Sequence, residues 1–184
     1  MGTHAPRIGD FADLFVRELV TAVVPKHPHY VIRTKPRADR QVRERLQAQG
    51  FLPLSLKFFP GFIFLRFHQA QRLQIGSLPG VHSIVGFAAQ PSAVNEEELE
   101  ALVRAAESRL QVGPAPFPAS GTLCRLIRGP LEGLSGVVMG ERDRPLVVLS
   151  LTLLQRSVAV EVQRDWIGDW IGAWIGRVDE DSAR

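Results

Sequence analysis

The chain has 184 residues, enough for one domain of average size or two small ones, and carries a formal net charge of +3. A hydrophobic content of 45% against 22% charged residues is typical of a globular protein and excludes an intrinsically disordered one. The single cysteine, Cys124, excludes an internal disulfide framework and favours a reducing cytosol, so we expect a cytoplasmic protein. We expect neither a membrane span nor a signal peptide, because charged residues interrupt every long apolar stretch.

Residues 1–28 are predicted to form an N-terminal extension. Apolar side chains recur there at helical spacing, after a possible N-cap at Asp10 and before Pro25. The pattern fits a short amphipathic helix packed on the rest of the protein, and it equally fits a segment that binds a partner.

Residues 29–34 are predicted to form a strand, and a helix is predicted from Pro36 to Gln49, closed by Gly50. Residues 51–56 read as a second extended piece. Positive charge concentrates around the helix, where six basic residues between Arg33 and Arg45 face only Asp39 and Glu44. Such a cluster is either a footprint for nucleic acid or a solvated helix face.

An aromatic segment, residues 57–67, holds five of the ten phenylalanines of the chain. Pro60 and Gly61 favour a bend, and the apolar run at residues 62–65 predicts a strand. The segment is either a buried central strand or an apolar patch that binds a partner.

Residues 71–75 are predicted to form a helical turn and residues 81–87 a strand. Asn95 is a strong N-cap candidate for the next helix, with Glu98 at the capping-box position. These elements predict an α+β fold for residues 29–112, a small α/β sandwich with helices on a sheet.

Three prolines within residues 113–120 predict a semi-rigid linker and a domain boundary. Beyond it, short strands are expected at residues 122–128, 134–139, 145–151 and 157–163. Glycine turns separate them, which predicts a small β-barrel over residues 121–166. In the tail, residues 167–184, a repeated Trp-Ile-Gly motif indicates either a poorly ordered end of the last strand or an adhesive interaction segment.

Segments in two parts of the chain resemble those of one family. Residues 121–138 resemble a KOW motif, and residues 30–37 and 59–64 resemble the first strand and the Phe-Pro-Gly-Tyr-type strand of an NGN domain. NGN followed by KOW is the layout of NusG-family transcription elongation factors. Residues 78–81 and 149–162 are more similar to the specialised RfaH and UpxY-like paralogues. The KOW motif residues would be Gly129, Pro130, Leu131, Gly133 and Gly136.

The resemblance implies an NGN-like sandwich followed by an SH3-like barrel. It also implies that Phe59, Phe62 and Phe64 bind the clamp helices of RNA polymerase, with Phe62 and Phe64 on one face of their strand. It places Lys35, Arg37 and Arg40 near upstream or non-template DNA. The barrel would recruit a ribosomal protein or a termination factor. The segment joining Leu54 to Phe58 is shorter than in the family, which predicts a truncated β-hairpin.

The pattern predicts a regulator rather than an enzyme. No nucleophile-and-base set, phosphate loop or metal-ligand spacing rises above chance, so we expect no catalytic residues, no metal and no cofactor. The leading hypothesis is a NusG-like elongation or antitermination factor that suppresses pausing or termination. The alternative is a ribosome-associated, KOW-type RNA-binding protein.

Overall fold

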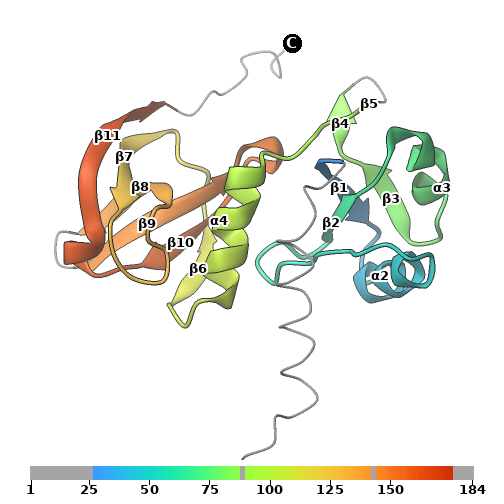
Figure 1. Ribbon diagram of the computed structural model, residues 1–184, viewed down its shortest axis with the longest axis horizontal. Coiled ribbons are helices and arrows are strands. Elements are labelled where there is room, and N and C mark those ends of the chain that lie inside the picture. The colour runs from blue at the N-terminus through green and yellow to red at the C-terminus, as the bar shows by residue number, and fades with distance from the viewer. Residues whose placement is uncertain (1–26, 88–89, 142–143, 176–184) are drawn as a thin grey trace, which may run out of the picture.

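The computed structural model describes residues 27–87, 90–141 and 144–175. Almost all of the predicted N-terminal extension therefore lies outside the described residues, as does the end of the predicted tail. Within the described ranges the chain has a mixed α/β architecture with two main sheets and few helices, which confirms the α+β class (Figure 1).

The N-terminal half, residues 27–110, is built on a three-stranded antiparallel sheet in the order β2-β1-β3. Its strands are β1 (His29–Thr34), β2 (Phe62–Arg66) and β3 (Val81–Ile84). The register sets Val31 opposite Phe64 and Ile32 opposite Ile63. The strand of the aromatic segment is thus an edge strand of its sheet and not the central one.

Alternation along these strands divides the sheet into two buried faces. One face carries Ile32, Ile63 and Leu65, and it packs against α2 (Asp39–Ala48) through Val42 and Leu46. The predicted helix is confirmed, although its first turn begins at Asp39 rather than at Pro36. The other face carries Val31 and Phe64 and belongs to a different core.

Residues between the two helical regions form short elements. Residues 51–61 contain only an isolated bridge from Leu54 to Phe64, so the expected second extended piece does not become a full strand. The 3-10 turn η1 (Gln69–Gln71) and α3 (Arg72–Gly76) follow β2. After β3, the two-residue strands β4 (Gly86–Phe87) and β5 (Gln90–Pro91) pair with each other.

The helix α4 (Glu96–Glu107) begins as predicted, because the Asn95 side chain accepts hydrogen bonds from the backbone N–H of Glu97 at 2.9 Å and of Glu98 at 3.2 Å. Its buried face consists of Leu99, Ala101, Leu102 and Ala105. Figure 1 shows α4 lying between the two main sheets.

The C-terminal half, residues 112–175, is a six-stranded antiparallel sheet in the order β11-β7-β8-β9-β10-β6. Four strands match the predicted ones closely, namely β7 (Ser120–Leu126), β8 (Ser135–Glu141), β9 (Arg144–Leu151) and β10 (Arg156–Glu161). The short 3-10 turns η2 (Thr152–Leu154) and η3 (Arg164–Trp166) flank β10.

Two further strands come from segments that were predicted to be linker and tail. Residues 112–115 form β6 (Val112–Ala115), paired with β10, so only residues 116–119 connect it to β7. Pro114 is tolerated because β6 is an edge strand, where a missing N–H breaks no central ladder. Residues 167–175 form β11 (Ile167–Ile175), which pairs with the open side of β7 through two irregularities in register.

The two halves share one hydrophobic core. It joins Val31 and Phe64 of the first sheet, Leu102 of α4, and Leu126 and Val160 of the second sheet. The proline-rich segment therefore marks a boundary in composition, whereas packing is continuous across it. Within the described ranges, no helix is both long enough and apolar enough to cross a membrane.

Candidate functional site

The three phenylalanines predicted to bind polymerase do not form an open patch in this arrangement. Phe59 and Phe64 are only 1% and 0% exposed, and their rings meet edge to face with centroids 6.4 Å apart. Phe62 is half-buried. The expectation that Phe62 and Phe64 are both presented to a partner is therefore not met, because the core shared with α4 and the second sheet encloses Phe64.

A surface pocket of about 420 Å³ lies beside Phe62, at the junction of the two halves. Two of the three predicted nucleic-acid-binding residues, Lys35 and Arg37, line this pocket. The third, Arg40, does not: its Nε donates to Oε1 of Glu44 at 2.8 Å on the exposed side of α2. We call this hollow the junction pocket.

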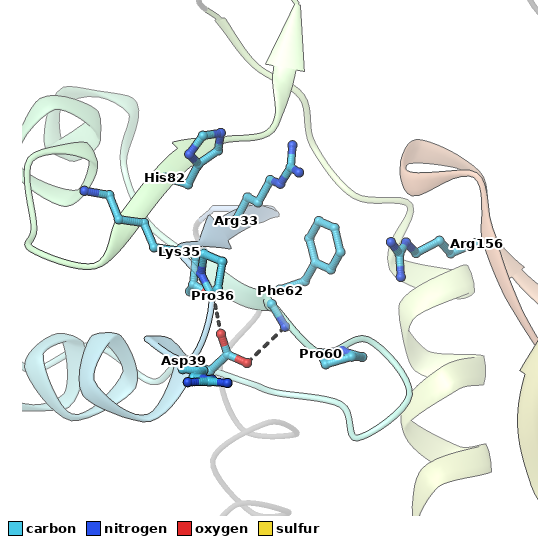
Figure 2. Close-up of a pocket in the computed structure, with 11 residues that line it drawn as sticks. Arg33, Lys35, Pro36, Asp39, Pro60, Phe62, His82 and Arg156 are labelled. Atoms are coloured by element: carbon cyan, nitrogen blue, oxygen red, sulfur yellow. Dashed lines mark hydrogen bonds between the residues drawn. The ribbon is translucent and has the colours of Figure 1, made fainter.

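Three further basic residues line the junction pocket: Arg33 from β1, His82 from β3 and Arg156 from β10. Figure 2 shows Arg33 rising beside Phe62, while Arg156 approaches the same ring from the C-terminal half. The Arg156 guanidinium lies 5.1 Å from the centroid of the Phe62 ring, within the range of a cation–π contact. The ammonium group of Lys35 points away from Phe62 in this view.

Asp39 shapes the loop on one side of the pocket. Its Oδ1 accepts a hydrogen bond from the Thr34 hydroxyl, and its Oδ2 accepts one from the Gly61 backbone N–H at 3.0 Å. This carboxylate therefore ties the start of α2 to the Pro60–Gly61 bend (Figure 2). Arg37, between Thr34 and Asp39 in the sequence, has the left-handed φ of 63°, which is uncommon for a residue with a side chain.

Sequence reasoning found part of this site. Lys35 and Arg37 stand in a visible run of basic residues, and Arg33 belongs to the same run. His82 and Arg156 carry no sequence signal, because their neighbourhood arises only when β3 and β10 are brought beside β1. The lining of the junction pocket suits an anion, since it holds four lysine or arginine side chains and a single carboxylate.

Polar contacts tie α4 to the C-terminal half. The Glu98 carboxylate accepts hydrogen bonds from the Thr152 backbone N–H at 2.9 Å and from the Thr152 hydroxyl at 2.6 Å. Glu98 thus serves as a link between halves instead of completing the predicted capping box. Near the other end of α4, Arg104 donates to the carbonyl oxygens of Pro130 at 3.0 Å and Glu132 at 2.9 Å.

The first turn of α4 is tied to the first sheet through Glu96. Its carboxylate accepts from the His29 backbone N–H at 2.9 Å, lies 3.0 Å from His29 Nδ1 and accepts from Arg66 at 2.6 Å. Burial lowers the pKa of His29 below its ordinary value, and the contact with Glu96 only partly offsets this. Burial alone would raise the pKa of Glu96, but the hydrogen bonds from His29 and the charge of Arg66 outweigh it and lower that pKa.

The predicted KOW residues form the turn between β7 and β8 and the start of β8. Gly129 and Gly133 have φ of 83° and 84°, and the side chain of Leu131 between them is fully buried. A Cβ on Gly129 would stand 2.7 Å from the ring of Trp166, so the ring packs on the bare backbone. Pro130 supplies a carbonyl to Arg104, and Gly136 lies in β8 opposite Cys124.

Within residues 27–87, 90–141 and 144–175, no group of three or more His, Cys, Asp or Glu side chains is arranged to hold a metal ion. Burial raises the pKa of the Cys124 thiol, which disfavours the reactive thiolate.

Comparison with known proteins gives a likeness among solved structures. No protein-family model and no curated protein sequence matches the chain. Among solved structures, the chain is similar to one described as "Domain interaction in Thermotoga maritima NusG", with 21% identity and a TM-score of 0.50. The likeness covers 77% of this chain and 96% of the Thermotoga chain. It shows that the two proteins share a fold that extends over most of this sequence.

Proposed function

We propose that this protein is a NusG-like transcription elongation factor that binds RNA polymerase and suppresses pausing or termination. The observation that carries the proposal is the structural likeness to Thermotoga maritima NusG, which covers 77% of the chain. The resemblance of residues 30–37 and 59–64 to an NGN domain, and of residues 121–138 to a KOW motif, supports the same assignment independently. A role like that of the RfaH and UpxY paralogues is the more specific form of this proposal.

Phe62 is the ring through which polymerase binding would begin. It is half-buried at the junction pocket, whereas Phe59 and Phe64 lie within the shared core. We propose that the observed arrangement is a docked state, and that binding the polymerase clamp helices separates the C-terminal half from α4 and the first sheet. Separation would expose Phe64 and join it to Phe62 on one face of β2.

The polar links between the halves suit such a separation. Glu98 and Arg104 are partly exposed, and their contacts with the C-terminal half are single side chains reaching backbone or hydroxyl groups. Hydrogen bonds to charged groups contribute about 1.5 to 3 kcal/mol each. A partner that covers the released apolar surface can therefore offset their loss.

Nucleic acid would lie along the basic side of the N-terminal half. Lys35 and Arg37 are exposed at the junction pocket, and Arg40 is exposed on the neighbouring surface of α2. Contacts of these side chains with phosphates would position upstream or non-template DNA without reading its sequence.

An elongation assay with the cognate polymerase tests the proposal. The wild-type protein should shorten pauses or increase read-through at a terminator, and Phe62→Ala should reduce this effect and the retention of polymerase in a pull-down. Phe87→Ala is the matched control, because Phe87 is 84% exposed on the separate β4–β5 pair and its loss should change neither readout. Equal retention of polymerase by both variants would contradict the assigned contact. Co-sedimentation with ribosomes, unaffected by Phe62→Ala and without polymerase binding, would favour the ribosome-associated alternative.

A further inference from the structure

The junction pocket is lined by side chains from both halves of the molecule, and this shared lining gives it a second role. We propose that it binds a phosphate-bearing ligand, a nucleotide or a nucleic-acid strand, and that the bound phosphate holds the two halves together. The inference goes beyond the proposed function, since it concerns the isolated protein and requires no polymerase.

The first argument is the charge that the fold gathers there. Arg33 comes from β1 and Arg156 from β10, which lie 123 positions apart in the sequence. Neither takes part in the ion pairs formed within the described residues, which join His29 and Arg66 to Glu96, Arg40 to Glu44, and Arg128 to Asp165. Two guanidinium groups held at one hollow without a carboxylate partner suit an incoming phosphate, whose oxygens they can bind in bidentate fashion.

The second argument concerns the single acidic residue of the pocket. Asp39 is engaged through both carboxylate oxygens, with the Thr34 hydroxyl and with the Gly61 backbone N–H. Its hydrogen bonds therefore stabilise the loop that leads into α2. The guanidinium groups of Arg33 and Arg156 are left for a ligand.

The third argument is the aromatic ring between the two halves. The ring of Phe62 carries the Arg156 guanidinium at 5.1 Å, so it orients this cation at the pocket. Figure 2 shows Arg33 beside the same ring. A volume of about 420 Å³ falls within the range of small-molecule sites and accommodates a phosphate together with part of the group that bears it.

The location of Arg156 makes the binding conditional on docking. A phosphate contacted by Arg33 alone is held by the N-terminal half, whereas one contacted by both arginines is held best when the halves are together. By linkage, such a ligand stabilises the docked state. Any change that destabilises the docked state therefore lowers the affinity for the ligand. Phosphate-bearing ligands and a partner that opens the molecule would then oppose each other.

Isothermal titration calorimetry on the full chain at low salt, in a phosphate-free buffer, tests the inference. The probes are pyrophosphate, ATP and a six-nucleotide thymidine strand, which separate a free nucleotide from a nucleic-acid backbone as the source of the phosphate. We expect at least one probe to bind with a single site. Arg33→Gln and Arg156→Gln should each weaken that binding about tenfold, as expected for losing one charge-assisted contact. Arg109→Gln, which removes an exposed positive charge just beyond α4, should leave it unchanged.

Glu98→Gln tests the link to docking. The substitution weakens the contact with Thr152 while making the protein more positive, so simple electrostatics predicts tighter anion binding. Our inference predicts severalfold weaker binding instead. It is overturned if no probe binds, if Arg156→Gln binds like the wild type, if Arg109→Gln is as damaging as Arg33→Gln, or if Glu98→Gln binds as tightly as the wild type or tighter. None of these results bears on whether the protein binds polymerase.

Discussion

Gly129 and Gly133 offer a sharp test of why the turn between β7 and β8 needs glycine. Their backbone conformations are almost identical, with φ of 83° and 84°. Their surroundings differ: a Cβ on Gly129 would lie 2.7 Å from the ring of Trp166, whereas a Cβ on Gly133 would meet nothing within 4 Å. Alanine at either position probes the backbone, and alanine at Gly129 probes the packing as well.

The expected magnitudes follow from these two contributions. Forcing an alanine into the left-handed region costs about 1 to 2 kcal/mol, and this should be the whole effect of Gly133→Ala. Overpacking against a side chain adds about 1 to 3 kcal/mol, so Gly129→Ala should lose about 2 to 5 kcal/mol of unfolding free energy. Trp166→Ala removes the ring, and in that background the cost of Gly129→Ala should fall to that of Gly133→Ala.

Urea unfolding followed by circular dichroism gives the unfolding free energy of the wild type, Gly129→Ala, Gly133→Ala, Trp166→Ala and the double variant Gly129→Ala/Trp166→Ala. The coupling between Gly129 and Trp166 follows from the double-mutant cycle. Equal losses for Gly129→Ala and Gly133→Ala would refute the packing argument. So would a cost of Gly129→Ala that is the same with and without the Trp166 ring.

Three further predictions concern the contacts of α4 with the two sheets. Leu102→Ala should cost about 2 to 5 kcal/mol of unfolding free energy in urea, because Leu102 is fully buried in the shared core. The control Leu73→Ala, at a site 75% exposed, should cost less than about 0.5 kcal/mol. Similar losses for the two variants would contradict the core assignment. Glu98→Gln should cost about 1 kcal/mol of unfolding free energy and speed proteolysis between the halves, since the Thr152 donors lose a charged acceptor. An unchanged rate of proteolysis would show that this contact does not hold the halves together. Stability should fall as pH drops below about 6.5, because the lowered pKa of His29 lets the unfolded chain bind its proton first. The lowered pKa of Glu96 extends the loss toward more acidic pH, and in His29→Gln the part near pH 6.5 should disappear from unfolding midpoints measured at pH 7.5, 6.5 and 5.5.

The docked arrangement changes how the aromatic segment is understood. Its sequence allowed either a buried strand or an exposed patch, and the structure combines the two: β2 is an edge strand, yet Ile63, Phe64 and Leu65 are fully buried. An edge strand can be buried in this way because α2 covers the face that carries Ile63 and Leu65, while α4 and the second sheet cover the face that carries Phe64. Phe58 and Phe62 remain half-buried at the surface, and the C-terminal half supplies Arg156 as a neighbour of Phe62.

Local signals predicted the elements well where a single residue or a short pattern decides the outcome. Asn95 caps α4 through its own side chain, and the apolar alternation of residues 157–163 places β10 almost where it was expected. Segments decided by pairing with distant strands were harder to predict, and for the tail the end of the last strand was one of two alternatives. Residues 112–115 and 167–175 have prolines or glycines that suggest a linker and a tail, but both pair with edges left open by β10 and β7.

By itself, the sequence determined the mixed α/β class, the caps and turns, and the resemblance that led to the NusG-like proposal, since these depend on neighbours along the chain. Only the tertiary structure decided which of the predicted site residues meet. It brought Arg33 and Arg156 to one pocket, set Arg40 apart against Glu44, and enclosed Phe59 and Phe64 in a core common to both halves. The physical reason is that burial and charge proximity depend on which faces pack together, and here α4 offers an apolar face that both sheets use.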